Sequence, residues 1–270
     1  MDKLSRAQSE LHETEALAAA DTPIHRLHPL CKLLVTLVYI AAVTSFPKYG
    51  FSGLAFFVLY PVLMFQAAGI PVSLCFYRLR IVLPLVCAVG LANPFLDHTS
   101  LLQIGSLTIS GGIISMFTLM MKGIFSLMAS FLLIATTSID VLCAALRKIH
   151  VPHILVTLLL LTYRYIGVML EQLSVMTQAY SLRAPGQKGI HISAWGSFLG
   201  QLLLRSMDRA EELFNSMQLR GFSGEFYYAD VPPCRVSSVL YAALCIAAFL
   251  LARSVDLPVL LGNLFMRFGI

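Results

Sequence analysis

The chain has 270 residues, of which 58% are hydrophobic and only 12% are charged, and it carries a formal net charge of +5. Soluble domains carry about 25% charged residues, so this composition excludes an ordinary soluble globular protein. We interpret the chain as an all-α polytopic membrane protein, and we attribute its basic excess to cytoplasmic loops rather than to nucleic-acid binding.

The N-terminal segment, residues 1–28, is polar. Its acidic residues precede any long apolar run, whereas a secretory signal places an apolar stretch soon after a basic start. These residues are Asp2, Glu10, Glu13, Glu15 and Asp21. We therefore expect a cytoplasmic segment, followed by a first membrane span that is retained.

Four apolar segments within residues 29–137 predict four membrane spans. They are Leu30–Phe46, Phe51–Gly69, Ile81–Leu96 and Gly112–Thr136. Crossing the hydrocarbon core takes about 20 helical residues, and tilt or local thinning of the bilayer accommodates shorter segments. Basic residues gather before the first span, between the second and third, and after the fourth, whereas Asp97–Ser110 has none. The positive-inside rule therefore places the N-terminus on the cytoplasmic side of the cell membrane.

Residues 138–235 predict a cytoplasmic module with two long amphipathic helices. The apolar run Ile154–Tyr163 is too short to cross the membrane alone, and apolar residues continue at helical spacing beyond it. We predict one helix from Pro152 to Leu182, which Pro185 brings to an end, and a second from Ser193 to Arg220.

The second helix combines an apolar stripe with a charged face. The stripe consists of Trp195, Phe198, Leu199, Leu202, Leu203, Met207, Ala210, Leu213, Phe214 and Met217. Arg205 with Asp208, and Arg209 with Glu212, have the i,i+3 spacing of ion pairs on the other face. A last apolar segment, Val236–Val255 within residues 236–270, predicts a fifth span. A sixth would be required if Ile154–Tyr163 crossed.

Both long helices end in leucine and arginine followed by a small residue: Leu182-Arg183-Ala184 and Leu219-Arg220-Gly221. A cation in the last turn interacts favourably with the helix dipole, by about 0.3–1 kcal/mol, and this capping interpretation suffices for a single arginine. Two matched endings favour a second interpretation, in which the guanidinium groups bind carboxylates of a partner. Gly221 suits the left-handed position just beyond a helix end.

Four stretches between Ile24 and Phe226 together carry a resemblance to a known family. They are "IHRLHPLCKLL", "ATTSID", "VPHILVTLLLLTYRYIGVMLEQ" and "NSMQLRGF". In order and spacing they resemble the transmembrane T component of energy-coupling-factor (ECF) transporters, the CbiQ/EcfT family. The first and last stretches look closest to its cobalt-type CbiQ branch.

The resemblance implies that the two arginine motifs lie on coupling helices and bind two cytosolic ABC ATPases. The family's Ala-Arg-Gly pattern falls on Leu182-Arg183-Ala184 and Leu219-Arg220-Gly221, with leucine in place of the first alanine in both and Ala184 in place of a glycine. It also implies that a separate membrane subunit captures the substrate. The ATPases would bind ATP, so we expect no cofactor in this chain and no catalytic residues.

Other residues with chemical potential have weaker patterns. Lys122 lies within the fourth span, where it either contacts the substrate-binding subunit or is paired within the bundle. The pairs His25/His28 and His150/His153 have helical spacing, but a proline lies beside or between them, and we predict no metal site. The cysteines lack zinc-site spacing, and no P-loop motif occurs.

These patterns predict a coupling subunit of an importer for cobalt or another transition metal. A vitamin-type T component is an alternative, because nothing in this chain separates cobalt, nickel and vitamins. A stand-alone membrane enzyme or channel is a further alternative from a different class. An enzyme should cluster carboxylates or histidines at the membrane surface, and the predicted spans contain almost none.

Overall fold

The computed structural model describes residues 2–48, 51–80, 82–96, 100–104, 107–187, 189–224 and 235–254. The chain divides into two compact units. The first, here called the bundle unit, comprises residues 18–137 and 232–270. The second, here called the crossed-helix unit, comprises residues 1–17 and 138–231.

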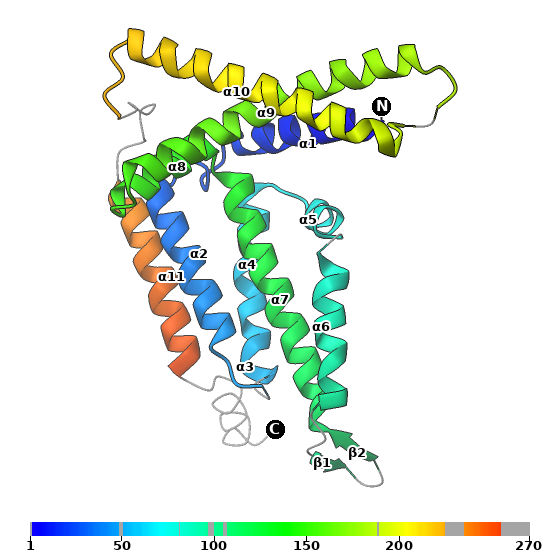
Figure 1. Ribbon diagram of the computed structural model, residues 1–270. Coiled ribbons are helices and arrows are strands. Elements are labelled where there is room, and N and C mark those ends of the chain that lie inside the picture. Colours follow the sequence, from blue (N-terminus) through cyan, green and yellow to red (C-terminus); the bar gives the residue numbers. More distant parts are fainter. Residues whose placement is uncertain are drawn as a thin grey trace. The chain divides into compact units, whose positions relative to one another are not determined.

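Apolar helices that lie side by side form the bundle unit (Figure 1). They are α2 (Pro29–Thr44), α3 (Phe51–Ala55) continued by η1 (Phe56–Val58) and α4 (Leu59–Ala68), α6 (Leu83–Leu96), α7 (Gly111–Thr136) and α11 (Val236–Ser254). The five apolar segments predicted as spans are thus helical, with ends that agree closely. The predicted end residues Ile81 and Val255 lie outside the described residues.

Length and composition allow several described helices to cross a membrane. Three qualify singly: Gly111–Thr136, His153–Arg183 and Val236–Arg253. A fourth crossing results if Gly53–Ala68 and Val72–Leu79, whose axes differ by 112°, count as one bent span. Pro29–Thr44 is apolar but shorter. The chain is therefore an all-α polytopic membrane protein.

An aromatic cluster holds the centre of the bundle unit. Tyr39 of α2 is fully buried, and its ring lies 4.7 Å from that of Tyr60 and 5.2 Å from that of Phe249. Its hydroxyl donates a hydrogen bond of 2.8 Å to the backbone oxygen of Phe57. The apolar rings thus join α2, η1, α4 and α11, while the one buried hydroxyl of Tyr39 is satisfied, as a low-dielectric interior requires.

Two lysines cap helix ends inside the bundle unit. Lys32 of α2 is 7% exposed, and its Nζ donates to Thr136 O at 2.7 Å, at the end of α7. It also reaches Thr137 Oγ1 at 3.4 Å and His25 O at 3.3 Å. Lys122 of α7 donates to Thr44 O at 3.1 Å and to Phe46 O, at the end of α2. Each ammonium group thus satisfies carbonyls that a helix end leaves without partners.

Several elements were not predicted. In the bundle unit, α5 (Val72–Leu79) follows a left-handed Gly69 with φ +68°, and β1 (Ser100–Ile104) pairs antiparallel with β2 (Leu107–Ser110) between α6 and α7. In the crossed-helix unit, α1 (Asp2–Ala18) and α8 (Ile139–Lys148) add two helices that have no long apolar run. Hydropathy predicts long apolar helices, so it did not predict these shorter or more polar elements.

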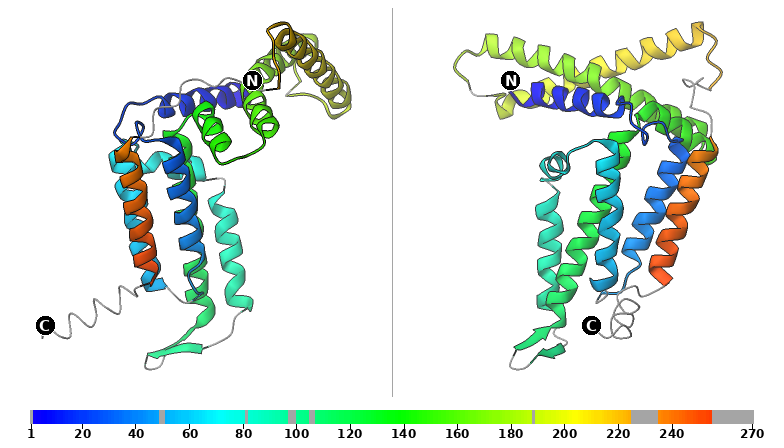
Figure 2. Two further views of the ribbon diagram at one scale, coloured as in Figure 1. Left: turned by 90° about the vertical axis from the view of Figure 1, so that its left-hand side faces the viewer. Right: turned by 180° about the vertical axis from the view of Figure 1, so that it is seen from behind.

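The crossed-helix unit is dominated by α9 (His153–Arg183) and α10 (Trp195–Leu219), which is preceded by η2 (Ile192–Ala194). These elements confirm the two long predicted helices. Figures 1 and 2 show that α10 turns back and crosses α9, so the C-terminal ends of the two helices lie at opposite ends of the crossing. The phenol of Tyr163 in α9 donates to Glu15 Oε1 at 3.2 Å and thereby ties α1 to this unit.

We predict that α9 does not cross the membrane and that the turn after it is cytoplasmic. In a variant without native cysteines, single cysteines at Gln187 and at Ser100 should label from opposite membrane sides with an impermeant maleimide. The reason is that the chain crosses the bilayer an odd number of times between Ser100 and Gln187 if only α7 spans. Labelling of both positions from one side would contradict the five-span topology.

Candidate docking site

The end of α10 is capped entirely by its backbone. Gly221 has φ +80°, its N–H donates to Gln218 O at 2.9 Å, and the N–H of Phe222 donates to Met217 O at 3.0 Å. This pair of bonds defines a Schellman motif with Gly221 in its left-handed position, as the sequence predicted. The carbonyls at this end therefore do not need the side chain of Arg220.

The end of α9 is built differently. Ala184 is the C-cap residue, with φ −126° and ψ 67°, and its N–H donates to Tyr180 O at 3.0 Å. Its φ is negative, so the end of α9 does not use the left-handed conformation that favours glycine. The phenol of Tyr180 donates to Gln187 Oε1 at 3.0 Å and accepts from the N–H of His191 at 3.3 Å. A hydrogen-bonded loop thus fixes the chain just after Arg183.

The leucine before each terminal arginine is almost fully exposed. Leu182 is 82% exposed and Leu219 is 89% exposed. An apolar side chain in this position contributes no core packing to its own helix. A leucine next to a guanidinium group places exposed apolar surface beside a multivalent hydrogen-bond donor, and a protein partner can cover both.

Each terminal arginine lines a cleft between α9 and α10. Arg220 shares a cleft of about 350 Å³ with Arg164 and Arg209. Arg183 shares a cleft of about 500 Å³ with Arg205. Each cleft therefore contains the terminal arginine of one helix and an internal arginine of the other, and no pattern in the sequence predicted this pairing.

Ion pairing distinguishes these arginines from one another. Arg209 donates to Glu212 Oε2 at 3.2 Å, which confirms that predicted pair. The predicted pair of Arg205 and Asp208 is not formed between these described residues, because Arg205 lines the cleft instead. Within the described part of the chain, no hydrogen bond or ion pair engages the guanidinium groups of Arg164, Arg183, Arg205 and Arg220.

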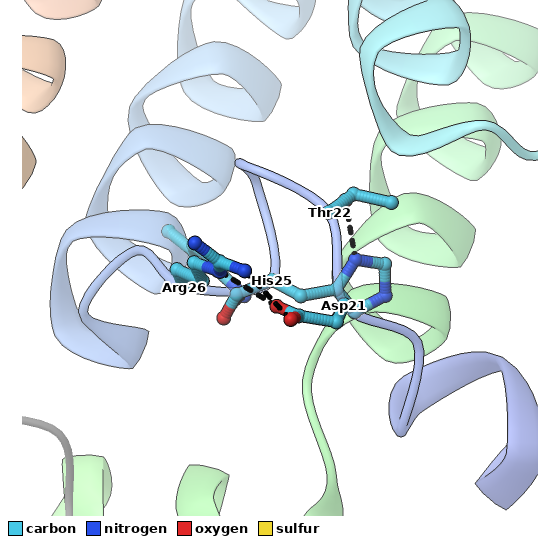
Figure 3. Close-up of polar contacts among 5 residues, drawn as sticks. Asp21, Thr22, His25 and Arg26 are labelled. Atoms are coloured by element: carbon cyan, nitrogen blue, oxygen red, sulfur yellow. Dashed lines mark hydrogen bonds and ion pairs between the residues drawn. The ribbon is translucent and has the colours of Figure 1, made fainter.

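The histidine pairs take part in local structure. Figure 3 shows His25 Nδ1 facing Thr22 Oγ1, at 2.6 Å, beside the two-pronged ion pair of Arg26 and Asp21. The Arg26 guanidinium lowers the pKa of the Asp21 carboxyl. His28 is 1% exposed, and its Nδ1 accepts the N–H of Leu30 at 3.2 Å, so it caps the start of α2.

His150 takes part in local structure through its backbone. It lies two residues beyond the end of α8 with φ +66°, and its N–H donates to Arg147 O at 3.1 Å. Across the described ranges, no three His, Cys, Asp or Glu side chains are grouped closely enough to hold a metal ion.

Comparison with known proteins places this architecture in a family. The model of the cobalt transport protein family, CbiQ, matches residues 20–228, a range that contains both arginine motifs and both clefts. The cobalt transport protein CbiQ of Rhodobacter capsulatus is 30% identical over 238 residues, which cover 85% of this chain and 93% of that protein.

Two further relatives carry related names. The energy-coupling factor transporter transmembrane protein EcfT of Bacillus selenitireducens is 27% identical over 219 residues, covering 76% of this chain and 81% of that protein. The nickel permease LarQ of Lactiplantibacillus plantarum is 30% identical over 91 residues, covering 34% of this chain and 33% of that protein. The chain therefore belongs to the CbiQ cobalt transport protein family, the membrane components of ECF transporters.

Proposed function

We propose that this chain is the coupling subunit of an ECF-type importer and that Arg183 and Arg220 bind two cytosolic ABC ATPases. One observation carries the proposal. Each long helix ends in an arginine whose guanidinium group has no polar partner among the described residues, which lines a cleft, and which follows a leucine more than four-fifths exposed. These three features are expected of a surface that a protein partner covers.

The number of partners follows from the arrangement of the two motifs. Because α10 turns back across α9, the C-terminal ends of the two helices, which carry the arginine motifs, lie at opposite ends of the crossing (Figures 1 and 2). One partner molecule is therefore expected at each end. The ATPases bind and hydrolyse ATP, and this chain has no cofactor and no catalytic residue in the proposed scheme.

The apolar face of the crossed helices supports a second contact. Leu199, Leu203, Met207 and Phe214 of α10 are each at least half exposed. A row of exposed apolar side chains along one helix indicates a surface buried by a partner or by lipid. We propose that this face supports a substrate-binding membrane subunit in the bilayer, so that ATPase movement at the helix ends reaches the substrate subunit.

Lys122 has a more local role in this proposal. Its hydrogen bonds to Thr44 O and Phe46 O favour pairing within the bundle over contact with the substrate-binding subunit. The lysine joins α7 to the end of α2, where its ammonium group is satisfied by the two carbonyls.

The proposed cargo is cobalt or another transition-metal ion, because two similar proteins are named for cobalt and nickel. A T component that serves a vitamin transporter is the alternative. Uptake assays of the complex with labelled cobalt, nickel and vitamins would separate these cargoes.

The assembly is tested by purification. The tagged chain, co-produced with the ATPase and small membrane proteins encoded beside it, should retain two ATPase subunits per chain in mild detergent. The complex should hydrolyse ATP. Uptake driven by this hydrolysis should require the presence of this chain. Purification of the chain without ATPases, under conditions in which it remains folded, would contradict the proposal.

Replacing the four paired histidines should leave uptake intact, because we assign them no substrate ligation. The variant combines His25→Gln, His150→Gln and His153→Gln with His28→Asn, since asparagine preserves a side-chain cap. His28→Ala is the contrasting variant and should lower stability by about 1 kcal/mol. Uptake of cobalt in cells is the measurement, and its loss in a correctly inserted, assembled variant would show that a histidine serves the substrate.

A further inference from the structure

The two clefts are assembled by the same cross-pairing of helices. In the first, Arg220 from the end of α10 shares the cleft with Arg164 from the first half of α9. In the second, Arg183 from the end of α9 shares it with Arg205 from the middle of α10. Each long helix thus contributes its terminal arginine to one cleft and an internal arginine to the other.

The charges in these clefts are not balanced by the described residues. Glu212 is the one acidic residue among the described residues that line either cleft, and it is already paired with Arg209. The cleft of Arg183 and Arg205 has no carboxylate in its described lining. Two guanidinium groups in each cleft therefore remain available to bind anions.

The apolar and aromatic residues that line the clefts indicate which kind of anion would bind there. Leu161, Tyr165 and Leu213 line the first cleft, and Tyr180 and Phe198 line the second. A small inorganic anion would leave these apolar walls uncovered. A protein segment with a carboxylate next to aliphatic side chains would satisfy the guanidinium groups and cover the walls together.

We propose that each partner is held by two arginines, Arg220 with Arg164 and Arg183 with Arg205, which together bind an acidic segment of the ATPase. This rests on the proposed function and extends it, because Arg164 and Arg205 lie outside the two motifs at the helix ends. The second arginine fixes the direction in which the segment enters the cleft, since a carboxylate bound by two helices cannot rotate about one of them. Force on the segment is then transmitted to α9 and α10 at once.

The test is ATPase binding to the full chain in lipid nanodiscs, measured as Kd at two salt concentrations. Arg164→Gln/Arg205→Gln should weaken binding by about tenfold or more, and it should flatten the dependence of Kd on salt, because two charge pairs are lost. Arg164→Lys/Arg205→Lys should recover the salt dependence but only part of the affinity, because lysine cannot make the bidentate contact.

The control is Arg6→Gln, which removes an exposed arginine of α1 that lines neither cleft. It should alter Kd less than about twofold, since a charge away from the contact is largely screened by salt. Wild-type Kd and salt dependence in the folded Arg164→Gln/Arg205→Gln variant would overturn the role of the second arginines. If Arg183→Ala/Arg220→Ala still lost the ATPases, the proposed function itself would stand. If the Arg164→Gln/Arg205→Gln variant does not fold, the single variants Arg164→Gln and Arg205→Gln test the role of the second arginines.

Discussion

Replacing Lys32 by methionine is expected to destabilise the bundle unit by about 3 kcal/mol. The side chain is 7% exposed, and its ammonium group donates to Thr136 O at 2.7 Å and lies within 3.4 Å of Thr137 Oγ1. Both threonines are buried, so water cannot replace the lost donor. A buried acceptor left without a partner costs about 1–3 kcal/mol. The apparent melting temperature in detergent should fall by roughly 5–10 °C.

Lys122→Met is the matched control for this prediction. Lys122 also donates to two carbonyls at a helix end, but it is more exposed, and so is one acceptor residue, Thr44. The expected loss is about 1 kcal/mol, because water can partly replace the ammonium group. A fall in melting temperature that is as large for Lys122→Met as for Lys32→Met would contradict the role assigned to burial.

Replacing Arg220 by alanine is expected to weaken ATPase binding by about 2–5 kcal/mol, because the partner's polar groups would be left unpaired. The fold should survive, since backbone bonds from Gly221 and Phe222 cap α10 without the side chain. If Arg220 served only as a cap, the loss would be at most about 1 kcal/mol and the complex would remain assembled.

Lysine at position 220 separates the two interpretations. Arg220→Lys preserves a cation at the helix end but not a bidentate contact, so it should keep the stability of the wild type and recover only a small part of the ATPase affinity. Gln218→Ala is the control at an exposed position of the same turn that does not line the cleft. Binding by the lysine variant equal to that of the wild type would favour the capping interpretation.

The long elements could be predicted because their signals are local. Apolar runs of sufficient length gave the helices of the bundle unit, and Pro152, Pro185 and Gly221 marked helix ends that the structure confirms. Proline restricts the backbone at its own position, and glycine tolerates the left-handed conformation that follows a helix end, so the sequence alone locates such ends.

The internal arginines of the clefts could not be predicted in the same way. Arg164 and Arg205 each lie within a helix, among residues of mixed polarity, and Arg205 has Asp208 at ion-pair spacing. Their position in the clefts depends on how α9 and α10 cross, which no local pattern encodes. The helix α1 escaped prediction for a related reason, because a tertiary contact such as that between Glu15 and Tyr163 holds it.

The central claim is that the arginines at the two helix ends bind the ATPases. It is tested most directly by purifying the Arg183→Ala/Arg220→Ala variant in mild detergent and measuring the ATPase retained per chain. Because both arginines contribute to ATPase binding, each single variant should impair uptake. The double variant should lose both ATPases while remaining inserted and folded. Full retention of the ATPases by the double variant, with uptake intact, would contradict the claim.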